Sequence, residues 1–210
     1  FDYDPETQAN IIQQNQKNVD ENGVGNAMSQ SYNHTILPLA ARVDKVTQVR
    51  WGIADYMYRF GHAPVGMWLP ETAVDNETLT VLADCGIQFT LLAPWQADAD
   101  ELDPSQPYRV DLPGNREITV FFYNQELSTR VSFDPSSTVN ADLFFSEHIV
   151  PRFVLDGEKR KQPQLVLISS DGELYGHHQP FRDKFLAHLL GGALKDQQVE
   201  LTYPALWLKK

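Results

Sequence analysis

The stretch 65–92 limits the possible fold more than any other part of the sequence. Residues 65–69 (VGMWL) and 87–92 (IQFTLL) are two short apolar runs of the kind that form buried strands. Between them, Asp75 is positioned to cap a helix over residues 76–85. Two strands joined through a helix lie parallel in one sheet with a right-handed crossover, so the pattern predicts a βαβ unit.

Periodicity predicts further elements on both sides of this unit. We expect helices over 44–60, 141–155 and 180–190, and strands over 118–123, 165–169 and 199–203. The first thirty residues, rich in Gln and Asn, indicate a loop or weak helix, and residues 98–116, with three prolines, indicate a long surface loop. The alternation predicts an α/β fold with a parallel sheet, either a barrel or a doubly wound layer, whose functional groups follow the carboxyl ends of strands.

Charge and cysteine content exclude several classes of function. The 210 residues carry 28 acidic and 17 basic side chains, a formal net charge of −11, without a basic run. This argues against nucleic-acid and membrane-surface partners, and no apolar run approaches the length of a membrane span. One cysteine excludes an internal disulfide and a thiolate zinc cluster. No leader precedes Phe1, so we expect a cytoplasmic protein, and the absence of an initial Met suggests a piece of a longer chain.

Two carboxylates follow predicted strands. Glu71 ends the segment Trp68-Leu69-Pro70-Glu71, and Asp171 follows the apolar run 165–168 and opens the segment DGELYGHH. Each has an ordinary structural interpretation, since a single Glu after a strand is usually solvated and Asp-Gly is a common turn. Because an α/β fold gathers strand ends on one face, the two carboxylates can nevertheless meet in one cleft.

A pair of converging carboxylates suits cleavage of a glycosidic bond. One carboxylate attacks or stabilises the anomeric carbon, and the other, kept protonated, donates to the leaving oxygen. The aromatic residues Trp68, Trp95 and Tyr175 could pack against sugar rings, and histidines could hydrogen-bond sugar hydroxyls. Glu173 is an alternative acid or a supporting group.

Three segments, in this order, resemble glycoside hydrolase family 57. They are His34-Thr35-Ile36-Leu37-Pro38-Leu39, Trp68-Leu69-Pro70-Glu71 and Asp171-Gly172-Glu173-Leu174-Tyr175-Gly176-His177. The stretch 26–96 more closely resembles the large bacterial members with an additional domain of unknown function. The likeness runs from about Asn26 to Trp207.

The resemblance implies an incomplete (β/α)7 barrel with parallel strands, and a retaining reaction on α-glucans that needs no metal or other cofactor. It transfers Glu71 as nucleophile and Asp171 as general acid/base. His34 carries over as a substrate ligand, and Trp68, Glu173 and His177 as residues lining the site. The partner is an oligo- or polysaccharide, and the sequence leaves the oligomeric state open.

The chain departs from the family in one respect. The family's opening segment, a histidine motif on the first barrel strand, is absent, as is a distal helical domain. We therefore expect residues 1–210 to form a single domain, a partial catalytic barrel without its first strand or strands. Such a chain should turn over substrate poorly in isolation.

Two alternatives remain at this point. A metal-dependent polysaccharide deacetylase could use His34, Asp171 and His177 or His178 as ligands, although no histidine pair has i, i+4 spacing. The chain could also be a non-catalytic carbohydrate-binding fragment. Sugar binding without turnover would indicate the latter.

Overall fold

The computed structural model describes residues 3–99, 101–153, 162–195 and 197–210. The chain divides into two compact units. The first comprises Phe1–Leu92, Tyr108–Phe121 and Thr202–Lys210, and the second comprises Ala93–Pro107 and Phe122–Leu201. The expectation of one domain over residues 1–210 stays a prediction.

The predicted βαβ unit is present in the first unit. β2 (Met67–Trp68) is followed by α3 (Asn76–Asp84) and β3 (Phe89–Leu92), and a parallel bridge joins Gly66 to Phe89. The carboxylate of Asp75 caps α3 by accepting a hydrogen bond from the Thr78 amide at 2.7 Å. β2 also pairs in parallel with β1 (Ser29–Gln30). The α/β class with parallel strands is thus confirmed, although β2 is shorter than the apolar run 65–69.

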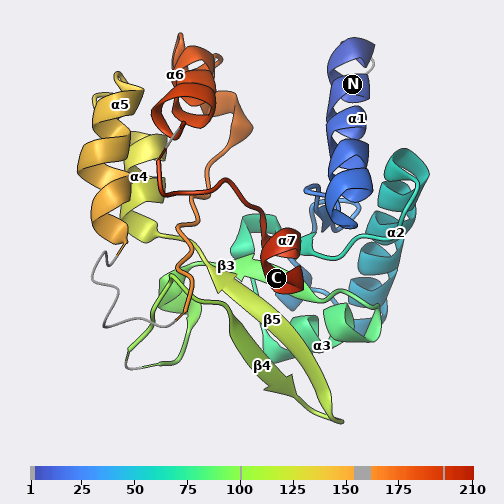
Figure 1. Ribbon diagram of the computed structural model, residues 1–210. Coiled ribbons are helices and arrows are strands. Elements are labelled where there is room, and N and C mark those ends of the chain that lie inside the picture. The colour runs from blue at the N-terminus through green and yellow to red at the C-terminus, as the bar shows by residue number, and fades with distance from the viewer. Residues whose placement is uncertain (1–2, 100, 154–161, 196) are drawn as a thin grey trace. The chain divides into compact units, whose positions relative to one another are not determined.

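Three helices complete the first unit: α1 (Pro5–Asn22), α2 (Arg42–Phe60) and α7 (Pro204–Lys209). α1 and α2 lie side by side (Figure 1). The opening residues form a regular helix of 18 residues, whereas a loop or weak helix was predicted. The Asp4 side chain caps the start of this helix, and the left-handed Gly23 ends it. The predicted strand 199–203 is wrong: this stretch has no strand pairing, and the Tyr203 hydroxyl donates to the Val24 carbonyl just before α7 begins.

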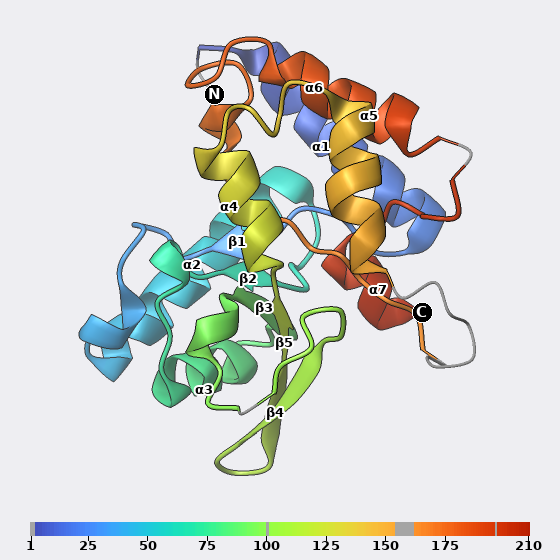
Figure 2. The ribbon, with the colours of Figure 1, turned by 90° about the vertical axis from the view of Figure 1, so that its left-hand side faces the viewer.

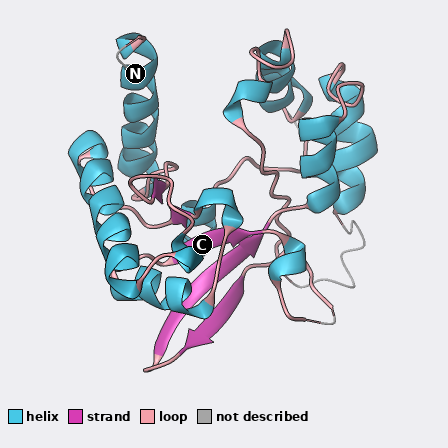
Figure 3. Cartoon of the chain, turned by 180° about the vertical axis from the view of Figure 1, so that it is seen from behind, coloured by secondary structure: helices cyan, strands magenta, loops and turns pink. Residues whose placement is uncertain are grey.

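A β-hairpin replaces much of the predicted loop 98–116. β4 (Tyr108–Leu112) and β5 (Arg116–Phe122) pair antiparallel, and the sheet order is β3-β5-β4 (Figure 3). The loop prediction was wrong because Gly114 and Asn115, with φ of 76° and 58°, form a tight turn between two strands. The strand predicted at 118–123 is confirmed by β5, which begins two residues earlier and ends one residue earlier.

The second unit is helical and has its own core. Its helices are α4 (Gln125–Phe133), α5 (Ala141–Leu143) and α6 (Arg182–His188), seen in Figure 2. α5 continues as a π-helical turn (Phe144–Ile149) and a 3-10 turn (Val150–Arg152), and α6 continues as a π-helical turn (Leu189–Ala193). The helices predicted over 141–155 and 180–190 are thus present in irregular form, and residues 154–155 lie outside the described residues. Leu127, Phe144 and Phe185 are buried together at the centre.

The strand predicted at 165–169 is absent. Residues 165–170 lack strand structure because their backbone bonds go to scattered partners rather than to one neighbouring strand. The Leu165 amide donates to the Ser105 carbonyl, the Asn124 amide to the Leu167 carbonyl, and the Ser169 amide to the Ser128 hydroxyl. Within the described part of the chain, no helix is both long and apolar enough to cross a membrane.

Candidate active site

Two parallel strands of the first unit bring His34 and Glu71 together. In the β1–β2 pair Ser29 lies opposite Met67, and His34 and Glu71 follow the ends of these strands. α2 lies close against β1, because a Cβ on Gly52 would stand 1.9 Å from the Gln30 carbonyl oxygen. His34 Nε2 lies 3.2 Å from Glu71 Oε1, so an N–H at Nε2 donates to the carboxylate. The two side chains are therefore in direct contact, and their membership of one catalytic site stays a prediction.

The backbone at this contact is strained. His34, Glu71 and Thr72 have φ of 52°, 55° and 52°, in the left-handed region that side chains disfavour. Each such residue costs on the order of 1 kcal/mol or more, and the β-branched Thr72 is the most unusual. Strain of this kind is concentrated at functional sites, where surrounding structure maintains it. Because 74% of the Glu71 side chain is exposed, this backbone conformation does more than packing to direct the carboxylate.

A buried lysine anchors the segment that follows Glu71. The Lys45 ammonium on α2 is 2% exposed and lies 3.1 Å from Asp75 Oδ2 and 2.9 Å from Glu77 Oε2. Burial opposes ionisation of Lys45, but hydrogen bonds from its ammonium to Glu77 and Asp75 outweigh it and raise the pKa. Burial likewise tends to raise the pKa of Asp75, yet the bonds from Thr78 and Lys45 lower it overall. α2 is therefore tied to the start of α3, four residues after Glu71.

A cavity of about 760 Å³ in the first unit runs up to these strands. Trp68, at the end of β2, contributes one wall, and its role in lining a substrate site stays a prediction. Tyr32 forms another part and meets Trp51 edge to face at 5.7 Å between ring centroids. The lining residues are Gln8, Met28, Ser29, Gln30, Tyr32, Asn33, Gly52, Asp55, Tyr56, Arg59, Phe60 and Trp68.

Asp171, Glu173 and His177 lie in one compact loop of the second unit. Asp171 precedes the 3-10 turn Gly172–Leu174, whose Leu174 is buried in the core. The amides of His177 and His178 both donate to the Glu173 carbonyl, at 3.2 and 2.8 Å. The Asp171, Glu173 and His177 side chains are all exposed.

The two halves of the predicted site thus belong to different units. His34, Trp68 and Glu71 are in the first unit, and Asp171, Glu173 and His177 are in the second. Their convergence on one sugar stays a prediction. Among the described residues, no three His, Cys, Asp or Glu side chains form a group that could hold a metal ion.

Sequence reasoning missed the polar residues of the cavity, among them its two charged side chains. Arg59 and Asp55 form a two-point ion pair on α2, with Nε–Oδ2 and Nη2–Oδ1 distances of 2.8 and 3.0 Å. Their i, i+4 spacing is visible in the sequence, but such spacing is common on solvated helix faces. Only the packing of α2 beside β1 reveals that they line a cavity.

Comparison with known sequences decides the family. Residues 5–206 match the profile of Glycosyl hydrolase family 57. The chain belongs to this family. The suspected resemblance is confirmed, and the chain is placed among the glycosyl hydrolases.

Three proteins are similar to this family 57 chain to different degrees in sequence and structure. Alpha-amylase 1 of Dictyoglomus thermophilum is 28% identical over 162 residues, which are 74% of this chain and 21% of that protein. A GH57-type branching enzyme from Pyrococcus horikoshii has the same fold, with a TM-score of 0.78 and 18% identity over all of this chain and 49% of that one. A putative polysaccharide deacetylase from Mycobacterium smegmatis is more distant, with a TM-score of 0.65 and 15% identity over 98% of this chain and 67% of that one. The chain thus spans about a fifth of the amylase and half of the branching enzyme.

Proposed function

We propose that this chain carries the catalytic carboxylates of a retaining glycoside hydrolase or transglycosylase that acts on α-glucans. The observation that carries the proposal is the Glu71 carboxylate, presented on left-handed backbone just past a parallel strand and 3.2 Å from His34. Family membership supports the reaction class. The related amylase and branching enzyme represent hydrolysis and transfer respectively.

Glu71 is the nucleophile in this proposal. Its carboxylate oxygen bonds to the anomeric carbon as the glycosidic bond breaks, and the Asp171 carboxyl gives its proton to the departing oxygen. Asp171 then accepts a proton from water or a sugar hydroxyl, whose oxygen attacks the anomeric carbon and releases Glu71. An N–H of His34 orients one Glu71 oxygen and leaves the other available for attack. Trp68, Glu173 and His177 line the bound oligo- or polysaccharide.

We infer that the strands belong to an incomplete (β/α)7 barrel. Supporting this, β1 pairs with β2, a parallel bridge links the residue before β2 to β3, and β3 is hydrogen-bonded to β5. In such barrels, side chains that follow the carboxyl ends of strands form the catalytic rim. Glu71 has this position after β2.

The other two candidate functions receive less support. The putative polysaccharide deacetylase has a similar fold, but its 15% sequence identity supports a shared architecture alone. The match to Glycosyl hydrolase family 57 covers residues 5–206 and favours the glycosidase. A carbohydrate-binding fragment without turnover is an outcome that the following test identifies.

The test is loss of turnover in two conservative variants of the full-length protein. Glu71→Gln and Asp171→Asn remove the nucleophile and the proton donor while keeping size and shape. We expect kcat on maltooligosaccharides to fall by at least about 10³-fold in the first and about 10²- to 10⁴-fold in the second. Product mapping separates shortened chains, which indicate hydrolysis, from longer or branched chains, which indicate transfer.

Glu117→Gln and Asp111→Asn are matched controls. These residues lie on the β4–β5 hairpin with side chains 66% and 80% exposed, so the same chemical changes should leave kcat within about twofold. Near-normal activity in Glu71→Gln or Asp171→Asn rejects the corresponding assignment. Sugar binding without turnover in the unmodified protein supports the binding fragment instead.

A further inference from the structure

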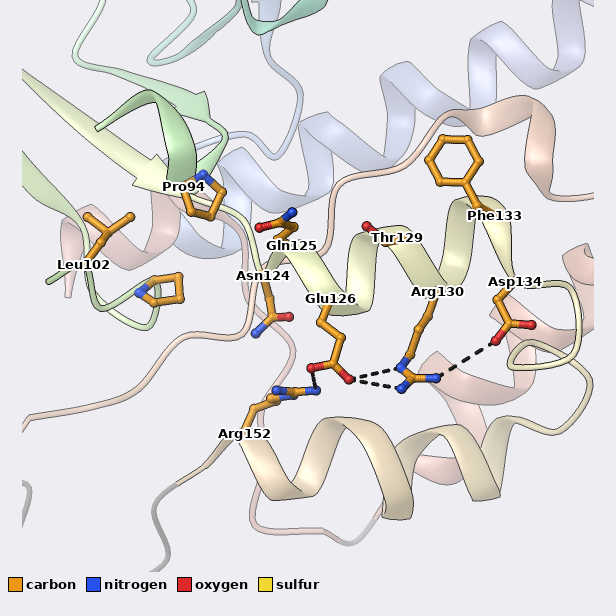
Figure 4. Close-up of a pocket in the computed structure, with 11 residues that line it drawn as sticks. Pro94, Leu102, Asn124, Gln125, Glu126, Thr129, Arg130, Phe133, Asp134 and Arg152 are labelled. Atoms are coloured by element: carbon orange, nitrogen blue, oxygen red, sulfur yellow. Dashed lines mark hydrogen bonds and ion pairs between the residues drawn. The ribbon is translucent and has the colours of Figure 1, made fainter. Parts of the chain in front are cut away.

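A groove of about 700 Å³ lies along the exposed side of α4, within the second unit. Figure 4 shows its polar side chains arranged along the helix, with Pro94 and Leu102 forming an apolar wall beyond the amino end of α4. Pro94 follows β3 by two residues, and Asn124, which opens the groove at the start of α4, follows β5 by two. Both residues therefore come shortly after a strand along the chain.

The charged groups in the groove compensate one another. The Glu126 carboxylate accepts hydrogen bonds from Arg130 Nε and Nη2, both at 3.1 Å, and forms an ion pair with Arg152. Arg130 also lies 4.0 Å from Asp134. Bonds from Arg152, and then from Arg130, lower the pKa of Glu126, so it stays ionised. Two negative and two positive groups leave no net charge, which favours a neutral ligand over a phosphate or a cation.

The uncharged groups match a sugar chain. Gln125, Thr129 and Phe133 occur at four-residue intervals and therefore share one side of α4. They offer an amide, a hydroxyl and an aromatic ring that is 82% exposed. Amide and hydroxyl groups donate to and accept from sugar hydroxyls, and an exposed ring offers a face to the C–H side of a pyranose.

The geometry points to a second glycan-binding site in the α4 groove, lined by residues other than the candidate catalytic carboxylates and occupied by a neutral oligosaccharide. It holds a further stretch of the same α-glucan, and to that extent it rests on the proposed function. Phe133 is the stacking platform, Thr129 and Gln125 bind hydroxyls, and the Glu126–Arg130–Arg152 cluster presents further hydrogen-bonding groups.

The test measures binding of maltoheptaose by calorimetry to full-length protein that carries Glu71→Gln, which the proposed mechanism expects to prevent turnover. Adding Phe133→Ala should weaken binding about three- to tenfold, because one aromatic contact is lost. Adding Thr129→Val, which keeps shape and removes the hydroxyl, should also weaken it. Tyr58→Ala is the matched control, because Tyr58 is a comparably exposed aromatic residue (88%) on α2, outside both cavities.

The outcomes separate this inference from the catalytic assignment. Weaker binding in Phe133→Ala than in Tyr58→Ala supports the glycan site, even if Glu71→Gln alone proves active and the nucleophile assignment fails. Equal affinity in the Phe133→Ala, Tyr58→Ala and parent proteins overturns the glycan site, even if Glu71→Gln abolishes turnover. Melting temperatures confirm that each variant is folded, as expected for exposed positions.

Discussion

Individual residues of the candidate site have conformations that stability alone does not favour. Of the five non-glycine residues with positive φ in the described chain, three are His34, Glu71 and Thr72. The cost of about 1 kcal/mol or more for each has to be offset by the surrounding structure. The buried Leu69 and Pro70 hold one side of Glu71, and the capped start of α3 holds the other.

We predict that Thr72→Gly lowers activity without lowering stability. Glycine adopts a left-handed φ without steric cost, which offsets the greater freedom it gives the unfolded chain. The freed backbone should direct Glu71 less well, so kcat should fall about tenfold or more while the urea midpoint stays the same or rises. Kinetics and urea unfolding measure the two effects.

Asn115→Gly is the control for this prediction. Asn115 also has a left-handed φ, of 58°, but it lies in the β4–β5 turn. Its replacement should leave kcat unchanged. Equal kcat in Thr72→Gly and the parent protein would show that the strain does not serve the nucleophile.

At the scale of elements, α2 positions the candidate nucleophile through two contacts. Gly52 allows α2 to approach β1, which precedes His34, and Lys45 binds Asp75 at the start of α3. Neither contact is local in the sequence, since Lys45 and Asp75 are 30 residues apart. α2 therefore contacts both the strand that precedes His34 and the start of the helix that follows Glu71.

We predict that Lys45→Met destabilises the protein by about 1–2 kcal/mol. Methionine fills the buried path of the side chain but removes the cation that Asp75 and Glu77 share. Glu77 keeps its ion pair with Arg42 at 3.8 Å, and the partial exposure of both carboxylates moderates the cost. Urea unfolding measures the change. Arg42→Met, which removes an exposed cation paired with Glu77 and Asp84, should cost less than about 0.5 kcal/mol.

The stability difference should also depend on pH. Because the folded-state pKa of Asp75 is lowered, its stabilisation is present above the unfolded value of about 3.9 and is lost as pH falls through the folded value. The gap between the parent protein and Lys45→Met should therefore narrow below about pH 4. When both proteins also carry Asp75→Asn, the part of this pH dependence that comes from Asp75 should disappear. If the difference in unfolding free energy between the parent protein and Lys45→Met stays the same down to pH 2, the stabilising role of the Lys45–Asp75 pair is contradicted.

At the scale of the whole molecule, the proposed reaction requires groups from both units. Glu71 belongs to the first and Asp171 to the second, so their separation is a property of the complete fold. In glycosidases this separation determines stereochemistry: about 5–5.5 Å accompanies retention, and about 6.5–9.5 Å accompanies inversion.

We predict that the first product released from an α-glucan has the α configuration. A covalent intermediate on Glu71 inverts the anomeric centre twice, which returns the original configuration. Proton NMR immediately after mixing, before mutarotation, measures the ratio of the anomers. Initial release of the β-anomer would contradict the nucleophilic role of Glu71 and indicate an inverting pair.

Much of the local structure and the family were predictable from the sequence because their signals are short in range. Caps at Asp75 and Gly61, the helical period of α2 and the βαβ pattern each depend on a few neighbouring residues. The family followed from three short segments containing His34, Glu71 and Asp171, and the profile match over residues 5–206 confirmed it.

Features that depend on residues distant in the sequence were determined only by the tertiary structure. Residues 165–170 are apolar enough for a strand but have no single neighbour with which to form one, whereas residues 108–112 became β4 because β5 pairs with them. The contact of His34 with Glu71 and the burial of Lys45 against Asp75 likewise join residues 30 or more positions apart. Helix caps and helical periodicity depend on residues within one or two turns of each other in the sequence. Strand pairing and burial depend instead on contacts between remote segments, and these contacts form only when the chain folds.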